Sequence, residues 1–216
     1  MSSPDFADLA RIRTEYAAQG LPDEVPADPL MLFATWFTQV RTAGLSEPNA
    51  MELGTIDETG APASRLVLLK GVEDGTFQFF TNLTSAKARQ LTADPRCAVL
   101  FPWHPLQRQV RITGVAEPIP RDEVEAYYAQ RPRAAQIGAW ASHQSQPIGS
   151  RTELDAQYAA ALDRFGEGTV PCPDFWGGFA ITPQTMEFWH GRTNRLHDRI
   201  RYQRDAAGWQ VQRLQP

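Results

Sequence analysis

The stretch from Met51 to Asn82, MELGTIDETGAPASRLVLLKGVEDGTFQFFTN, decides the fold class. Apolar and polar residues recur in it with the two-residue period of a strand over three segments, Met51–Ile56, Ser64–Lys70 and Thr76–Asn82. DETG at 57–60 and EDG at 73–75 are rich in turn-forming residues, and turns this short connect antiparallel neighbours. The stretch therefore predicts three consecutive antiparallel strands.

The rest of the chain extends this pattern. We expect further strands at Arg96–Trp103, Arg108–Ile119, Phe179–Ile181, Met186–His190, Arg199–Gln203 and Trp209–Arg213. We expect helices at Pro29–Gly44, Ser85–Thr92, Arg121–Gln130 and Arg151–Phe165, and one from Ser3 to Gly20. Few of these helices could serve as crossovers, which argues against a doubly wound parallel sheet. The pattern favours an α+β fold, an antiparallel barrel with peripheral helices over 29–216, after an N-terminal helical or extended segment, 1–28.

Composition and charge exclude several classes of protein. Apolar residues make up 42% of the chain and charged residues 21%, which is ordinary for a folded globular protein. The net charge of −4 argues against a nucleic-acid partner bound through a broad basic face. No apolar run approaches the roughly 20 residues of a membrane helix. The two cysteines, Cys97 and Cys172, lie far apart, so we expect a cytoplasmic protein with no membrane association, no disulfide framework and no metal site.

Common catalytic and phosphate-binding motifs are absent from the sequence. It contains no G-x-G-x-x-G after a strand, no G-x-x-x-x-G-K-[ST] and no H-E-x-x-H. The four histidines have no metal-ligand spacing among themselves. These absences exclude the usual dinucleotide-binding loop, the P-loop and the zinc-protease helix.

Cations stand at several places where an anion could bind. Arg65 and Lys70 bracket an apolar LVLL run that reads as a buried strand, and on a strand they point to opposite faces. Lys87 lies in the first turn of a helix that directly follows a strand, a setting that suits phosphate. Tyr127 and Arg131 are four residues apart, hence neighbours on one helical face, and could hold a phosphate together. Solvated strand and helix ends are the alternative interpretation of each pair.

The C-terminal segment FWHGRTNRLHDR, residues 188–199, concentrates cationic groups. Arg195, His197 and Arg199 alternate, so in an extended chain all three face the same side, near Trp189. Such a face is costly to bury without an anionic or aromatic ligand. We therefore interpret this segment as a binding surface.

Taken together, these segments resemble the pyridoxamine 5′-phosphate oxidase family. The motifs that carry the resemblance are RLVLLK (65–70), FTN (80–82), FPWH (101–104), RQV (108–110), RPR (131–133), QIGAW (136–140), FWGGF (175–179) and RLHDR (195–199). Each motif alone is weak, but the set is specific because it runs in family order from about Leu30 to the C-terminus. The first thirty residues contribute little.

The resemblance implies a fold and an activity. It implies a split β-barrel homodimer, with residues 29–216 forming an FMN-binding oxidase domain. The expected enzyme oxidises pyridoxamine 5′-phosphate, and pyridoxine 5′-phosphate, to pyridoxal 5′-phosphate, the final step of vitamin B6 cofactor synthesis. Dioxygen would accept the electrons and leave as hydrogen peroxide, and the amine substrate would release ammonia.

The resemblance also implies roles for individual residues. Arg65 and Lys87 would bind the FMN phosphate, and the rest of the cofactor site would be Leu66, Val67, Leu68, Lys70, Phe80, Thr81, Gln109, Gln144, Ser145, Trp189 and Arg199. The substrate phosphate would be held by Lys70, Tyr127 and Arg131. Arg195 and His197 would flank the pyridine ring as the catalytic residues.

Two positions depart from the family pattern, and two other functions stay open. Ala86 stands where an arginine is usual, and Ala135 replaces a serine that would contact the substrate phosphate. The loss at Ala135 would suit a split-barrel flavin oxidase of another aromatic metabolite. The second alternative is a non-catalytic flavin-binding or pyridoxal-phosphate-binding protein. The segment 195–199 argues against this second alternative, because a protein that only stores its ligand does not need residues that flank the pyridine ring.

Overall fold

The computed structural model describes residues 14–16 and 20–216. Most of the helix predicted from Ser3 to Gly20 falls on residues 1–13 and 17–19, which lie outside the described residues, and residues 14–16 and 20, which are described, are not helical. The chain divides into two compact units. We call residues 49–101 and 112–185 the large unit, and the described residues of 1–48, 102–111 and 186–216 the small unit. The boundary expected between residues 28 and 29 stays a prediction.

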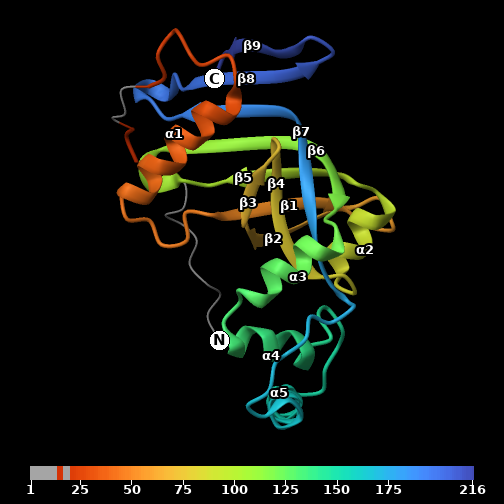
Figure 1. Cartoon of the computed structure of the whole chain (residues 1–216). Helices are drawn as coiled ribbons and strands as arrows, with labels where there is room; N and C mark the ends of the chain where they lie inside the picture. The colour runs from red at the N-terminus through yellow and green to blue at the C-terminus, as the bar shows by residue number, and fades with distance from the viewer. Residues whose placement is uncertain (1–13, 17–19) are drawn as a thin grey trace. The chain divides into compact units, whose positions relative to one another are not determined.

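The large unit is built on an antiparallel sheet (Figure 1). Its strands are β1 (Ala50–Ile56), β2 (Pro62–Leu68), β3 (Gly71–Glu73), β4 (Thr76–Asn82), β5 (Arg96–Phe101), most of β6 (Arg108–Pro118) and the first part of β7 (Trp176–His190). They are ordered β2-β1-β5-β6-β7-β4-β3. β1 pairs antiparallel with β2 and β5, and β4 pairs antiparallel with β3 and β7. The β1–β2 pairing confirms the first expected hairpin, and the sheet confirms the α+β class. The second hairpin differs from the prediction, because the turn at 73–75 joins β4 to the short strand β3 and not to β2.

The local sequence explains the two hairpin turns. After β1, the Asp57 carboxylate accepts hydrogen bonds from the backbone N–H groups of Thr59 (2.8 Å) and Ala61 (3.0 Å). Between β3 and β4, Asp74 and Gly75 both have positive φ angles, +48° and +79°. That backbone matches the type I′ turn, whose twist suits a two-residue hairpin. The turns thereby set the register of each pair.

Alternation along the strands buries one face of the sheet. Met51 and Leu53 of β1 and Phe77 and Phe79 of β4 are fully buried. β2 differs from the prediction, because Leu66 in its LVLL run is 68% exposed. β2 lies at the end of the strand order, next to β1, so its apolar residues are only partly covered.

The helices of the large unit are α2 (Ala86–Ala93), α3 (Arg121–Ala129), α4 (Arg133–Ala141) and α5 (Arg151–Phe165). Ser85 caps α2, because its side chain accepts a hydrogen bond from the backbone N–H of Ala88. α4 and α5 pack side by side (Figure 1) around a cluster made by Ile137, Ala141, Ala161 and Val170. The sequence predicted α2, α3 and α5 but neither α4 nor the short strand β3.

The small unit contains α1 (Pro29–Thr42), the start of β6, the end of β7, β8 (Asp198–Asp205) and β9 (Gly208–Leu214). The Asp28 carboxylate caps α1 by accepting from the backbone N–H of Leu30 at 2.9 Å. Trp36 of α1 packs edge-on against Phe188 of β7, with ring centroids 5.3 Å apart. β8 pairs with β7 and, antiparallel, with β9.

β7 corrects one prediction. Two separate strands were expected at 179–181 and 186–190, and Pro183 lies between them. The structure instead has one strand that continues through this proline. A Cβ atom on Gly178 would lie 2.8 Å from the backbone oxygen of Phe79. A glycine at this position therefore lets β7 approach β4 closely.

Candidate active site

A pocket of about 560 Å³ opens in the large unit. Its lining residues are Leu66, Val67, Leu68, Lys70, Phe80, Thr81, Lys87, Tyr127, Gln130, Arg131, Pro132, Ala135, Gln144 and Trp176. Lys70, Lys87 and Arg131 bring positive charge to it, whereas no Asp or Glu stands among these described lining residues. Most of the site residues predicted from the sequence meet in this pocket, and its charge suits an anionic ligand.

Lys87 lies in the first turn of α2, and its ammonium group contacts residues from other segments. The Nζ atom lies 3.2 Å from Thr81 Oγ1 and 3.1 Å from Gln144 Oε1. Burial lowers the pKa of Lys87, and the nearby charge of Arg65 lowers it further. An anion bound beside Lys87 would offset both effects.

Gln144 and Ser145 follow α4 and reach the N-terminus of α2. Ser145 has a left-handed backbone, with φ of +69°. Its Oγ accepts a hydrogen bond of 3.2 Å from the backbone N–H of Ala86. Together with Lys87, this loop places an amide, a hydroxyl and an ammonium group at a helix N-terminus, where backbone N–H groups also favour anions.

Arg65 lies on β2 but is not among the residues that line the pocket. Its guanidinium is held by hydrogen bonds to β1 and α2. Its guanidinium donates to Gln90 Oε1 at 2.9 Å, to the backbone oxygen of Leu53 at 3.2 Å and to Thr55 Oγ1. Gln90 Oε1 also accepts from Thr55 Oγ1 at 2.7 Å. Burial lowers the pKa of Arg65. Sequence reasoning missed Gln90 and Thr55; the inward position of Thr55 in the β1 alternation was the available signal.

Aromatic rings surround the substrate-phosphate residues expected from the sequence. Phe80 and Tyr127 stack with centroids 3.8 Å apart and planes at 7°. The Arg131 guanidinium lies 3.9 Å from the centroid of Trp176. Its Nη1 atom is buried and has no hydrogen-bond partner among the described residues. Burial lowers the pKa of Arg131, so an anion beside the guanidinium would stabilise its charged form. Because buried N–H groups are normally paired, the position of Nη1 indicates a site where a ligand would supply a hydrogen-bond acceptor.

The predicted residues Gln109, Trp189, Arg195, His197 and Arg199 belong to the small unit. Arg199 is held by Glu187, whose Oε1 accepts from its Nε at 2.9 Å. Arg111 lies 3.5 Å from the same carboxylate. Glu187, which sequence reasoning missed, is largely buried. Its carboxylate therefore holds the guanidinium groups of Arg199 and Arg111 in place.

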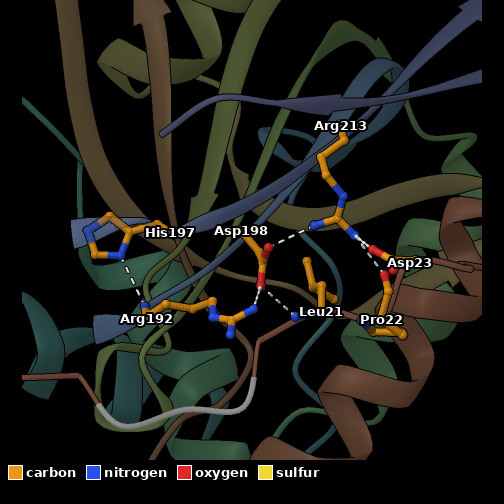
Figure 2. A network of polar contacts seen from close by, with 7 residues as sticks. All are labelled: Leu21, Pro22, Asp23, Arg192, His197, Asp198 and Arg213. Atoms are coloured by element: carbon orange, nitrogen blue, oxygen red, sulfur yellow. Dashed lines mark hydrogen bonds and ion pairs between the residues drawn. The ribbon is translucent and has the colours of Figure 1, made fainter. Parts of the chain in front are cut away.

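His197 has a defined hydrogen-bonding state. The backbone N–H of Arg192 donates to its Nδ1 at 3.1 Å (Figure 2), so in the neutral ring the proton lies on Nε2. Burial lowers the pKa of His197, and the charge of Arg195 lowers it further. The ring also contacts Trp189, with centroids 4.6 Å apart. His197 thus offers an N–H donor at Nε2.

The expected alternation of Arg195, His197 and Arg199 on one extended face is wrong. Residues Thr193–Arg195 form a 3₁₀ turn, and strand β8 begins only at Asp198. Asn194 and Arg195 both have left-handed backbones, with φ of +56° and +61°. The period-two pattern therefore applies only from the start of β8.

The described residues contain neither a metal-binding cluster nor a membrane-spanning helix. In residues 14–16 and 20–216, no group of three or more His, Cys, Asp or Glu side chains could hold a metal ion. Across those same residues, no helix combines the length and the apolar character needed to cross a bilayer.

Fold and pocket together define the class, an α+β split-barrel protein with a cation-lined pocket. The model of the pyridoxamine 5′-phosphate oxidase family matches residues 37–164. The model of the pyridoxine 5′-phosphate oxidase C-terminal dimerisation region matches residues 176–216. The chain therefore belongs to the pyridoxamine 5′-phosphate oxidase family.

Individual relatives agree with this assignment. The pyridoxine/pyridoxamine 5′-phosphate oxidase of a Nocardioides species is 52% identical over 97% of this chain and 98% of that protein. The protein of the same name from Rubrobacter xylanophilus is 48% identical over 97% of each chain. Among solved structures, PhzG from Burkholderia lata, in complex with tetrahydrophenazine-1-carboxylic acid, has a TM-score of 0.85 and 32% identity, covering 90% of this chain and 95% of that one.

Proposed function

We propose that this chain is an FMN-dependent oxidase that converts pyridoxamine 5′-phosphate, and pyridoxine 5′-phosphate, to pyridoxal 5′-phosphate with dioxygen. The observation that carries the proposal is the pocket of the large unit, where three cations surround stacked aromatic rings without an acidic residue in the described lining. The names of relatives that match nearly the full chain favour this reaction over the oxidation of another aromatic metabolite and over ligand storage.

We also propose a cytoplasmic location, which suits the free thiols of Cys97 and Cys172.

The donor set around α2 fits the phosphate of FMN. Arg65 and Lys87 are close enough that the charge of one lowers the pKa of the other, so a dianion would relieve their repulsion. Thr81, Gln144 and Ser145 would add neutral hydrogen bonds. We assign the remaining cofactor contacts to Leu66, Val67, Leu68, Lys70, Phe80, Gln109, Trp189 and Arg199. When bound, FMN would accept two electrons from the substrate and deliver them to dioxygen.

The substrate phosphate is assigned to Lys70, Tyr127 and Arg131. The buried Nη1 of Arg131 supports this assignment, because a phosphate oxygen would supply the acceptor that it lacks. The phenol of Tyr127 stays protonated, since burial raises its pKa, and can donate to the same phosphate. The phosphate is remote from the reacting carbon, and the free energy of binding it serves to orient the pyridine ring.

Arg195 and His197 are assigned to the pyridine side of the substrate. His197 would donate from Nε2 to an oxygen or nitrogen of the substrate ring. The left-handed backbone at Arg195 directs an exposed guanidinium from the turn, and this guanidinium would position the carbon that is oxidised. Both residues act here by binding and orientation.

The decisive experiment is an aerobic assay of the purified protein with both phosphorylated substrates. The protein should be yellow, and each substrate should yield aldehyde and hydrogen peroxide. Dephosphorylated substrates should react far more slowly, because Lys70 and Arg131 would lose their partner. Undetectable turnover of both phosphates by FMN-loaded protein would refute the proposed function.

The chain is further proposed to act as a homodimer. Residues 176–216 match the family's dimerisation region, and Leu66, at the exposed edge strand β2, also lines the pocket. A second copy would cover this strand and enclose the cofactor. We expect dilution to release FMN as dimers dissociate. Light scattering combined with absorbance tests this expectation, which a monomer with stoichiometric FMN would contradict.

Restoring a serine at position 135 should strengthen substrate binding. Ala135 lines the pocket near Arg131, and a hydroxyl donated to a charged phosphate is worth about 1.5–3 kcal/mol at best. Because this contact is remote from the reacting carbon, Ala135→Ser should lower KM about tenfold and leave kcat nearly unchanged. Steady-state kinetics with pyridoxamine 5′-phosphate measures both.

Ala86→Arg is the matched control for that experiment. Ala86 begins α2 beside Lys87, so an added guanidinium there should tighten FMN and leave the substrate KM unchanged. If Ala135→Ser instead changed FMN affinity and not KM, position 135 would not face the substrate phosphate.

A further inference from the structure

Three donors from different parts of the small unit converge on the carboxylate of Asp198 (Figure 2). Its Oδ2 accepts from the backbone N–H of Leu21 at 2.9 Å and lies 3.3 Å from Nη1 of Arg192. Its Oδ1 lies 2.7 Å from Nη1 of Arg213. The Asp198 side chain is only 13% exposed, so these contacts fix its orientation.

The chain at Gly20 is shaped for close approach to this carboxylate. Gly20 has φ of +87°, and a Cβ atom on it would lie 2.2 Å from Asp198 Oδ2 and 2.9 Å from Cδ of Arg192. A side chain at position 20 would therefore push the Leu21 amide away from Asp198. The glycine makes the contact between residues 20–21 and the carboxylate possible.

Arg213 of β9 forms a second link to the same N-terminal segment. Its Nη2 donates to the backbone oxygen of Pro22 at 2.8 Å and lies 3.4 Å from Asp23 (Figure 2). The Asp23 side chain is fully exposed, so this outer ion pair contributes little. Asp198 is the inner residue of the network, and Asp23 belongs to its rim.

The network leads directly to His197. Arg192, whose side chain binds Asp198, donates its backbone N–H to Nδ1 of His197. Between them, Asn194 and Arg195 hold left-handed backbones, which persist only where surrounding contacts impose them. The Asp198–Arg192 contact closes this turn at both of its ends.

We propose that Asp198 is a positioning residue, which holds the 192–197 turn so that His197 keeps Nδ1 as an acceptor and presents its N–H at Nε2. The role of that N–H toward substrate rests on the proposed function. In this assignment Asp198 contacts neither the substrate nor the flavin. It acts through Arg192.

The test compares Asp198→Asn with Asp23→Asn in the FMN-loaded enzyme. Asp198→Asn can still accept a hydrogen bond from the Leu21 amide but loses both ion pairs, whereas Asp23→Asn removes the same charge from the rim of the network.

The first measurement is the ¹⁵N spectrum of labelled histidines at alkaline pH, with the His197 signals assigned by comparison with His197→Asn. A fixed tautomer gives two well separated ring signals, and a mixture gives averaged ones. His104 and His143 serve as internal references.

We expect Asp198→Asn to average the His197 signals, leave both references in place, and lower kcat/KM about tenfold with unchanged FMN affinity. Asp23→Asn should match the wild type. Gly20→Ala retains the carboxylate, but its added Cβ atom would collide with Asp198 Oδ2 and displace the Leu21 amide. It should therefore move the same His197 signals, and it carries the test if Asp198→Asn does not fold. Unaltered His197 signals in the folded variants would overturn the proposal. Because the spectrum needs no substrate, it remains decisive even if the wild type fails to oxidise pyridoxamine 5′-phosphate.

Discussion

Arg195→Leu should retain FMN and lose about 99% of kcat/KM for pyridoxamine 5′-phosphate. Leucine keeps most of the bulk but removes the charge and all five N–H donors. Hydrogen bonds from a charged group are worth about 1.5–3 kcal/mol, and the upper end corresponds to about a 100-fold loss. Arg195 makes no ion pair with the described residues, and its guanidinium carbon lies 5.9 Å from the Tyr16 ring. Its removal should therefore leave folding intact.

The matched control is Arg204→Leu, the same substitution at an exposed residue of β8 in the same unit. It should keep full activity. Steady-state kinetics, FMN absorbance and thermal unfolding of both variants separate a lost contact from lost structure. Wild-type kcat/KM in Arg195→Leu with normal FMN content would show that Arg195 does not position the substrate.

Much of the fold could be predicted from the sequence because its determinants are local. The alternation in β1 and the turn formers Asp57 and Asp74 act within a few residues, and each places its strand correctly. The cap Ser85 likewise marks the start of α2. Such signals survive in a single sequence because no distant contact is needed to produce them.

The missed features depend on contacts between distant segments. The turn around Asn194 is left-handed, and the network that closes it joins Asp198 to Leu21, 177 residues away. No period in the sequence carries that information. The support of Arg65 by Gln90 also joins two elements, and the partners lie 25 positions apart in the sequence. Residue types and motifs thus predicted the candidate groups for the site, while long-range contacts decide how each group is oriented.

Lys87→Met should weaken FMN binding about 100-fold, on the order of 3 kcal/mol. Removing one partner of a hydrogen-bonded charge pair typically costs about 2–5 kcal/mol. Methionine keeps the length of the side chain, and the hydroxyl of Thr81 and the amide of Gln144, the partners of Nζ, are neutral. The loss should therefore appear in FMN affinity, with little change in stability of the apoprotein. Titration of the apoprotein with FMN, followed by flavin fluorescence, measures it.

The same lysine should make FMN affinity fall at alkaline pH. Burial and Arg65 hold the pKa of Lys87 below its ordinary 10.5 in the free protein, and a bound phosphate dianion raises it again. Binding FMN therefore takes up a proton between those two pKa values, so affinity decreases as pH rises through that window. Lys87→Arg should bind FMN and remove this decrease, because a guanidinium stays protonated there. An equal alkaline decrease in Lys87→Arg and wild type would assign the titration to another group.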